Sequence, residues 1–283
     1  MKRYGTFLLL IVVIIWCYAA DFVRLVGRWW EDPDYVYGFL VLPFAVWLLW
    51  RRRSMAANWQ ATNGVYAGIA LILFAIVMRA ASAYISDPVF GPMSLIPCLA
   101  GVVLLLGGWG GLHWAWPSIV FLVFMIPLPS FVASLGNLLL QRVATVLSTL
   151  VLQTIGIPSV AYGNIIVMTH GQLNVAEACS GLRSTMLFFA VSVGAAFLVK
   201  GLPEKITVLL SAVPATVLAN VCRIASPGVL HEVVGPEVAG AVFHDLFGFL
   251  MLPLASTIVW GEIGLVRHVL VSEEQHGPLP IDD

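Results

Sequence analysis

The sequence predicts an all-α polytopic membrane protein. Of its 283 residues, 60% are hydrophobic and only 10% are charged, whereas a soluble domain has about 25% charged residues. The hydrophobic residues form long runs separated by short polar stretches. Trp and Tyr flank many of these runs, as expected at the two membrane interfaces. We expect about eight transmembrane helices, one amphipathic helix and one short β-hairpin.

Composition and motifs exclude several classes of function. A formal net charge of -1 without a basic face argues against a nucleic-acid partner. The four cysteines show neither the CxxC nor the Cys/His spacing of a zinc site, and no disulfide framework. No GxxxxGK[ST] and no GxGxxG after a strand is present, so nucleotide chemistry has no support. We therefore expect neither a cofactor nor a metal ion.

Basic residues beside the apolar runs set the expected orientation. Two basic residues precede the run Thr6–Ala20, and Arg51–Arg53 end the run Tyr37–Trp50. Such clusters lie on the cytoplasmic side of a membrane. We therefore expect a retained signal-anchor helix, a cytoplasmic N-terminus and an external polar loop at Asp21–Asp34.

Three further apolar runs follow in the first half of the chain. They are Gly64–Met78, Met93–Leu106 and Pro117–Ile126, joined by an external loop at Arg79–Gly91 and a short aromatic turn at Gly107–Trp116. Each run is somewhat shorter than the roughly 20 residues that an upright spanning helix needs. The flanking aromatic residues extend these helices into the interfaces.

The segment Phe131–Ile155 has a different pattern, because polar side chains recur in it at three- and four-residue steps. This spacing predicts an amphipathic helix. Such a helix either lies along the outer interface or packs inside the bundle with its polar stripe buried. We expect that this helix does not cross the membrane. If it crossed, Lys200, Lys205 and Arg267 would lie on the external side, whereas basic residues beside spans are usually cytoplasmic. The stripe consists of Ser134, Asn137, Gln141, Thr145 and Ser148.

Two β-rich runs around Gly171 predict an external β-hairpin at about 163–176. Three more spans are expected after it, at Leu182–Val199, Ile206–Ala219 and His244–Val266. Residues 1–271 are interpreted as one integral-membrane domain. The polar tail at 272–283 is expected to be disordered and cytoplasmic.

The most reactive stretch is Asn174–Ser184, which contains Cys179 directly before an apolar helix. Free amides at a helix N-terminus favour a thiolate. The expected topology brings Arg223 and His244 to the outer ends of the next two helices. An imidazole is suited to deprotonate a thiol, and a guanidinium to stabilise an oxyanion. These three residues are the candidate catalytic group.

Four further residues are secondary candidates. Glu177 or Asp245 could orient an imidazole as a third member of the group, although Asp245 fits a helix cap equally well. Asn220 could hold the catalytic arginine or form an ordinary interhelical hydrogen bond. Arg183 is a rival cation on the same helical face as the cysteine.

Simpler interpretations stay open for the candidate group. Cys179 could be a buried core thiol, or it could form a disulfide with Cys222. Arg223 could bind free carbonyls at a helix C-terminus. His170 in the hairpin and His231 in the expected external loop are rival histidines, both interpreted as surface residues.

These residues resemble the exosortase/archaeosortase family of membrane transpeptidases. The likeness lies in Glu177–Ser184, then Asn220-x-x-Arg223, then His244 with Gly248. It extends upstream: Tyr37–Val41, running on to the three arginines, is similar to the second span of that family, and Phe124–Pro129 to its fifth.

The resemblance implies an activity and a place in the cell. It implies cleavage of C-terminal sorting signals, each a short motif, a transmembrane helix and a basic tail, in exported proteins. A thioacyl-enzyme on Cys179 would pass the new C-terminus to an acceptor, with Arg223 and His244 as catalytic partners. The expected location is the prokaryotic inner membrane, with the site on the extracytoplasmic face. Tyr37 stands where the family usually has His, which leaves the sorting motif open.

Two other function classes are weighed against this one. A transporter or channel could use the polar stripe of Phe131–Ile155 as a pathway, but no repeat with matching broken helices is visible. A non-catalytic membrane assembly factor is the third possibility.

Overall fold

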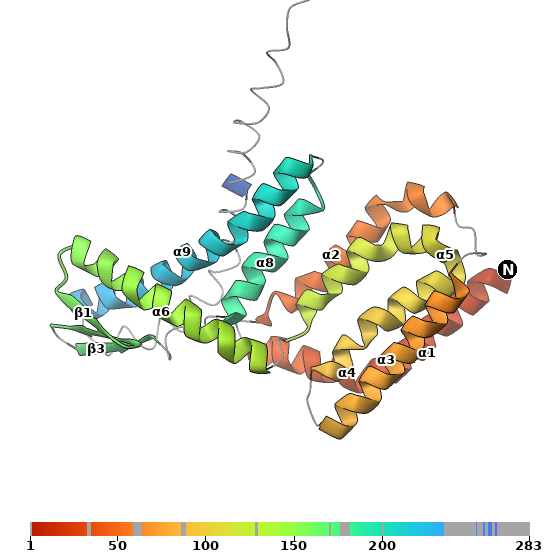
Figure 1. Cartoon of the computed structure of the whole chain (residues 1–283), viewed down its shortest axis with the longest axis horizontal. Helices are drawn as coiled ribbons and strands as arrows, with labels where there is room; N and C mark the ends of the chain where they lie inside the picture. Colours follow the sequence, from red (N-terminus) through yellow and green to blue (C-terminus); the bar gives the residue numbers. More distant parts are fainter. Residues whose placement is uncertain are drawn as a thin grey trace, which may run out of the picture. The chain divides into compact units, whose positions relative to one another are not determined.

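The computed structural model describes residues 2–32, 35–58, 64–85, 89–127, 130–169, 171–175, 182–199 and 201–234, with Pro253, Thr257, Trp260, Gly261 and Gly264. The chain divides into two compact units, Met1–Ser130 and Phe131–Asp283, and each is described by itself (Figure 1). The described elements are mostly helical and include one small sheet. The predicted single domain at 1–271 stays a prediction, and the tail at 272–283 lies outside the described residues.

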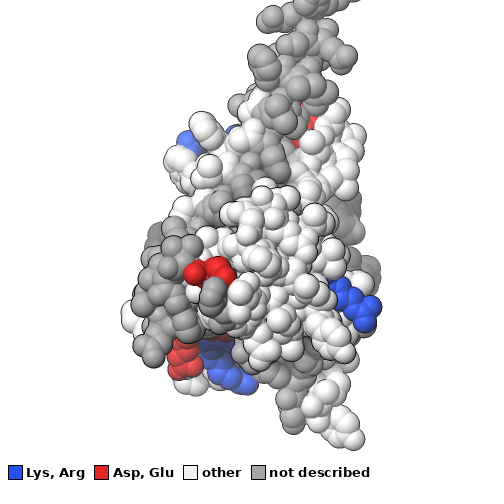
Figure 2. Space-filling view, turned by 90° about the vertical axis from the view of Figure 1, so that its left-hand side faces the viewer, with Lys and Arg blue, Asp and Glu red and all other residues white. Residues whose placement is uncertain are grey.

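The first unit consists of apolar helices. They are α1 (Lys2–Glu31), α2 (Gly38–Arg51), α3 (Val65–Ile85), α4 (Phe90–Met93) and α5 (Leu95–Phe121), with the 3-10 helices η2 (Arg53–Asn58) and η3 (Leu122–Met125). The face that Figure 2 shows belongs mainly to the second unit, and little of its described surface is charged.

The loop predicted at Asp21–Asp34 is wrong, because α1 continues as a helix to Glu31. The reason lies in the partner of Asp21. Nη1 of Arg79 donates a hydrogen bond to Oδ2 of Asp21 at 2.8 Å, and the aspartate side chain is only 7% exposed. A paired carboxylate can be buried inside a helical unit. Arg79 likewise lies within α3 and not in the loop predicted at Arg79–Gly91.

The reversal predicted at Gly107–Trp116 is confirmed within α5. Gly108 has φ 59° and ψ -159°, a backbone conformation that favours glycine, and two helices meet there (Figure 1). The helix before Gly108 approaches α3 where Gly68 faces Gly101. The helix after it lies along α2, where Trp114 Nε1 donates to the Leu49 carbonyl at 3.2 Å.

Three described helical stretches are long and apolar enough to cross a membrane. They are Val65–Ile85, Phe90–Met125 and Leu202–Glu232, while Gly38–Arg51, Leu138–Thr154 and Met186–Ala196 are shorter apolar helices. The expected number of about eight spans is therefore not confirmed. Two of its members, Met93–Leu106 and Pro117–Ile126, fall within the stretch Phe90–Met125, which the reversal at Gly108 divides into two helices.

The second unit begins with α6 (Ser130–Thr154) and continues through the strands β1 (Ser159–Tyr162), β2 (Ile165–Met168) and β3 (Gly171–Asn174) to the helices α8 (Leu182–Ala196) and α9 (Leu202–Val234). The sheet is antiparallel in the order β1-β2-β3. The predicted hairpin is confirmed as β2 and β3. Strand β1 was missed, although Gly163-Asn164 is a two-residue hairpin turn with positive φ at the glycine.

Helix α6 confirms the helix predicted at Phe131–Ile155, and its polar stripe points into the second unit. Thr145 and Ser148 are fully buried. Asn164 Nδ2 donates to Gln141 Oε1 at 3.0 Å, and Ser148 Oγ donates to the Val221 carbonyl at 3.5 Å. The side chains of Ser134 and Asn137 lie outside the described residues. The opposite face exposes Leu138, Leu139, Val143, Val146, Leu147 and Leu150.

Helix α9 corrects the predicted span Ile206–Ala219. The helix continues to Val234, so Asn220 and Arg223 lie inside it and not at its end. Pro214 and Pro227 do not end the helix, although each removes one backbone donor. The buried residues Ile224 and Ala225 hold its second half in the core of the unit, which explains why it does not stop at Ala219.

Candidate active site

Two polar side chains are buried next to each other on α9. Arg223 is 6% exposed and Asn220 is 1% exposed. Their three-residue separation places them on one face of the helix. Burying a guanidinium at membrane depth is costly, so a buried arginine is a stronger candidate for a functional residue than an exposed one. The interpretation of Arg223 as a group at a helix C-terminus is wrong, because α9 continues beyond it.

Helices α8 and α9 form an antiparallel pair, and this pairing sets the level of Arg223. Val208 packs with Ala195 and Ala196 near the turn between the helices. From that contact, Arg223 is about 22 Å along α9 and Leu182 is about 20 Å back along α8, at 1.5 Å per residue. Arg223 therefore lies level with the first turn of α8.

Val175, the residue that follows β3, packs against the part of α9 that contains Arg223. Val175 is fully buried in one cluster with Ile224 and Ala225 of α9. Its backbone N–H donates to the Asn164 carbonyl at 2.9 Å. The two described residues that flank segment 176–181, Val175 and Leu182, thus both lie beside the part of α9 that contains Arg223.

Several predicted site residues lie outside the described residues: Glu177, Cys179, His244 and Asp245. The backbone of Arg183 belongs to α8, but its side chain is not described. Cys222 is a free and exposed thiol, which argues against the alternative disulfide. Among the described residues, no three His, Cys, Asp or Glu side chains are grouped to hold a metal ion.

His231 was expected in a surface loop, and the structure corrects this. It lies in the last turn of α9, and its ring faces Gly171 of β3, where a Cβ would come within 2.5 Å of Cε1. Its Nδ1 is buried and has no hydrogen-bond partner among the described residues. The seven-residue step from Ile224 places His231 on the core-facing side of α9, a signal that was available in the sequence. His170 lies outside the described residues.

In the first unit, Trp29 lies between the two upstream motif segments, which begin at Tyr37 and at Phe124. The sequence alone did not indicate Trp29. The indole of Trp29 lies against Gly38, and its Nε1 donates to the Met125 carbonyl at 3.1 Å. A glycine is needed at position 38 because any Cβ there would collide with the indole. Tyr37 is buried beside this contact. Trp29 therefore joins Tyr37–Val41 to the described part of the later motif, residues 124–127.

A family model described as the transmembrane exosortase matches residues 29–261. The chain belongs to the exosortase family. The match contains both units' motif segments and all the candidate site residues, so the resemblance inferred from the sequence is confirmed. Exosortases are a family of membrane cysteine peptidases and transpeptidases, and this exosortase is an integral membrane protein. The comparisons with curated proteins and with solved structures returned no match.

Proposed function

We propose that this exosortase is a membrane-embedded cysteine transpeptidase that acts on exported proteins. It cleaves them at a C-terminal sorting signal, which consists of a short motif, a transmembrane helix and a basic tail. The observation that carries the proposal is the buried Arg223, level with the first turn of the helix that follows the cysteine segment. Cys179 is the nucleophile, Arg223 the electrostatic stabiliser and His244 the base.

The reaction proceeds in two balanced halves. His244 takes the thiol proton, and the Cys179 thiolate attacks the scissile carbonyl carbon. The C–N bond breaks, a thioester forms, and the imidazolium returns the proton to the leaving amine. An acceptor nucleophile, or water, then attacks the thioester and releases the thiol. In both halves the carbonyl oxygen carries negative charge in the transition state, and Arg223 stabilises it.

Burial of Arg223 supports this role physically. Charge interactions are stronger in a site that excludes water than at a solvated surface. Helix α9 and the surrounding core fix the side chain in advance, so that little reorganisation is needed during the reaction. Asn220, one turn earlier on the same face and also buried, is proposed to orient the guanidinium or the substrate carbonyl.

Covalent geometry supports a short distance between Cys179 and this region of α9. Cys179 is four residues after Val175 and three before Leu182, which limits it to about 14 Å and about 11 Å from those Cα atoms. Val175 packs in one cluster with Ile224 and Ala225 of α9, and Leu182 begins α8, whose first turn is level with Arg223. These limits keep Cys179 in the neighbourhood of that part of α9.

The test is processing of a co-expressed exported protein that carries such a signal and originates from the same genome. We expect Cys179→Ala to abolish processing, and Arg223→Lys to slow it by about 10² to 10³-fold, because lysine keeps the charge but loses the planar fork. Cys222→Ala and Arg142→Lys are matched controls, since both side chains are exposed. All four variants should insert and elute as the parent protein does. Normal processing by Cys179→Ala would refute the proposal.

A further inference from the structure

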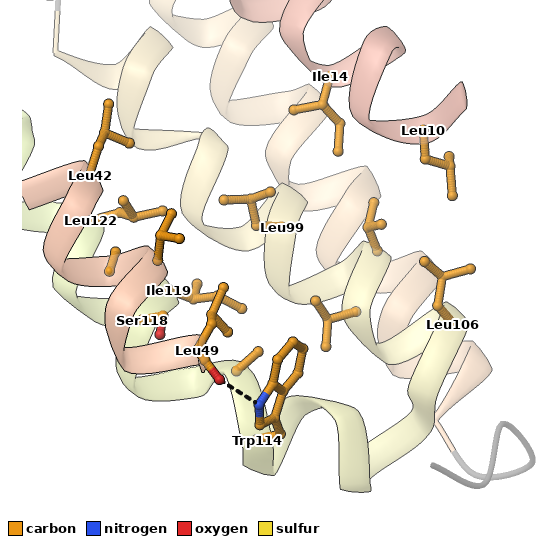
Figure 3. A pocket seen from close by; sticks show the side chains of 15 residues that line it. Leu10, Ile14, Leu42, Leu49, Leu99, Leu106, Trp114, Ser118, Ile119 and Leu122 are labelled. Atoms are coloured by element: carbon orange, nitrogen blue, oxygen red, sulfur yellow. Dashed lines mark hydrogen bonds between the residues drawn. The ribbon is translucent and has the colours of Figure 1, made fainter. Parts of the chain in front are cut away.

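An apolar cavity of about 250 Å³ lies within the first unit and includes none of the candidate catalytic residues. It is bounded by α1, α2 and both halves of α5 (Figure 3). Its lining ranges from the buried Ala45 to Val46, which is 63% exposed, so the cavity reaches from the interior of the unit to its surface.

Three arginines border one end of this cavity. The end is formed by Leu49 and Trp114, which are joined by the hydrogen bond drawn in Figure 3. Arg51, Arg52 and Arg53 follow Leu49 closely in the chain. Arg52 Nη2 donates to the His113 carbonyl at 2.9 Å, directly beside Trp114.

The other two guanidinium groups are held by aromatic rings. That of Arg51 lies 5.3 Å from the centre of the Trp47 ring, and that of Arg53 lies 4.4 Å from the Trp50 ring. Cation–π contacts of this kind orient a guanidinium without neutralising it. Three positive charges therefore lie close to one end of an apolar cavity.

The surface that faces the cavity is apolar throughout. Ser118 lies in the wall, and its side chain is labelled in Figure 3, but its buried Oγ presents no surface to the cavity. The space therefore suits a hydrocarbon chain, and the polar groups of an occupant must lie outside it, at the arginine end.

We propose that the cavity binds one anionic glycerophospholipid. An acyl chain enters the apolar space, and the phosphate lies at Arg51–Arg53. Clusters of basic residues at a membrane interface recognise anionic head groups. The site does not depend on the proposed peptidase activity.

The proposal is tested by native mass spectrometry of the delipidated full-length protein in detergent. Palmitoyl-oleoyl-phosphatidylglycerol is titrated in parallel with the phosphatidylcholine of the same chains and with glycerol phosphate. We expect one tightly bound phosphatidylglycerol, at least about fivefold weaker binding of phosphatidylcholine, and no binding of glycerol phosphate. Equal affinities for the two lipids would overturn the proposal, as would binding of glycerol phosphate alone.

Two pairs of variants separate the cavity from general lipid contacts. Val46→Trp fills the cavity edge, and Val77→Trp is its control, because Val77 on α3 is equally exposed, at 63%, and lies outside the lining. Arg52→Gln removes one bordering charge, and Arg28→Gln is its control, a guanidinium held over the Tyr35 ring. We expect Val46→Trp to abolish tight binding of phosphatidylglycerol. Arg52→Gln should weaken it about fivefold, the usual contribution of one basic residue to the affinity for an anionic lipid. Unchanged binding in both test variants would overturn the proposal, provided that their melting temperatures match those of the controls.

Discussion

At the scale of single residues, the described part of each unit has a charged side chain buried among apolar helices, Asp21 in the first and Arg223 in the second. Asp21 in the first unit is paired with Arg79, and Tyr18 Oη lies 2.9 Å from Ser94 Oγ in the same group. The Arg79 guanidinium also lies 4.5 Å from the centre of the Tyr18 ring. This polar group joins α1, α3 and the start of α5, so its role in the first unit is to fix the positions of helices.

The Asp21 pair leads to a prediction about stability. Asp21→Asn removes the charge opposite Arg79, and we expect it to lower the stability of the first unit by about 1–3 kcal/mol. This is below the value for a fully buried pair, because the Arg79 side chain is 37% exposed and partly solvated. The measurement is the melting temperature of the purified protein in detergent.

The control for this change is Arg24→Gln. Arg24 also lies close to Asp21, at 3.5 Å, but its side chain is 65% exposed. An exposed pair of this kind contributes about 0–1 kcal/mol. A loss of stability in Arg24→Gln as large as in Asp21→Asn would show that net charge, and not the buried pair, stabilises the helices.

At the scale of elements, α6 is amphipathic in the opposite sense to a soluble surface helix. Its Thr145 and Ser148 face the core, and the apolar residues Leu139 and Leu150 face outward. The polar stripe makes hydrogen bonds to the turn before β2 and to α9: Gln141 Oε1 accepts from Asn164 Nδ2 at 3.0 Å, and Ser148 Oγ donates to the Val221 carbonyl at 3.5 Å. The stripe therefore serves contacts within the second unit, which weakens the interpretation of α6 as the wall of a transport pathway.

The contact between β3 and α9 gives a prediction at the same scale. Gly171→Ala places a Cβ within 2.5 Å of the His231 ring, so the ring must move. We expect a loss of about 1–3 kcal/mol, the usual effect of overpacking a core. The double variant Gly171→Ala/His231→Ala should recover part of the loss, because the collision is removed. The measurement is a double-mutant cycle of melting temperatures.

Gly27→Ala is the matched control, since no atom lies within 4 Å of a Cβ at position 27 and that residue lies within α1. Alanine in a helix is favoured over glycine, so this variant should be neutral or slightly more stable. A double variant that is no more stable than Gly171→Ala would mean that the strain is not caused by His231.

At the scale of the whole molecule, the expected orientation is testable in the intact chain. Arg51–Arg53 are expected in the cytoplasm, and the sheet of the second unit on the other side. Green fluorescent protein fused after Ser54 should therefore fluoresce. Alkaline phosphatase inserted at Gly163, an exposed turn between β1 and β2, should be active. A signal from only one of the two fusions would place both positions on the same side of the membrane. That result would contradict the charge-based orientation, and with it the proposal that α6 does not cross.

The sequence by itself determined the membrane class, the family and the list of candidate residues. These properties are local or compositional: 60% hydrophobic residues exclude a soluble chain, and motifs such as Asn220-x-x-Arg223 are read without knowing where they lie. The turn at Gly107–Trp116 and the β2–β3 hairpin were predictable for the same reason, since both depend on neighbouring residues.

Only the tertiary structure decided where helices end and what their polar residues face. Asp21 and Arg223 were assigned to a loop and to a helix end because a charged residue usually stops an apolar run. Each is instead inside a helix: Asp21 is paired with Arg79, and packing of Ile224 and Ala225 in the core continues α9 beyond Arg223. The side of α6 that is buried and the contact of His231 with Gly171 likewise depend on pairs of residues far apart in the chain. The free energies of burial and pairing depend on contacts between such distant residues, so they cannot be predicted from any one segment of the sequence.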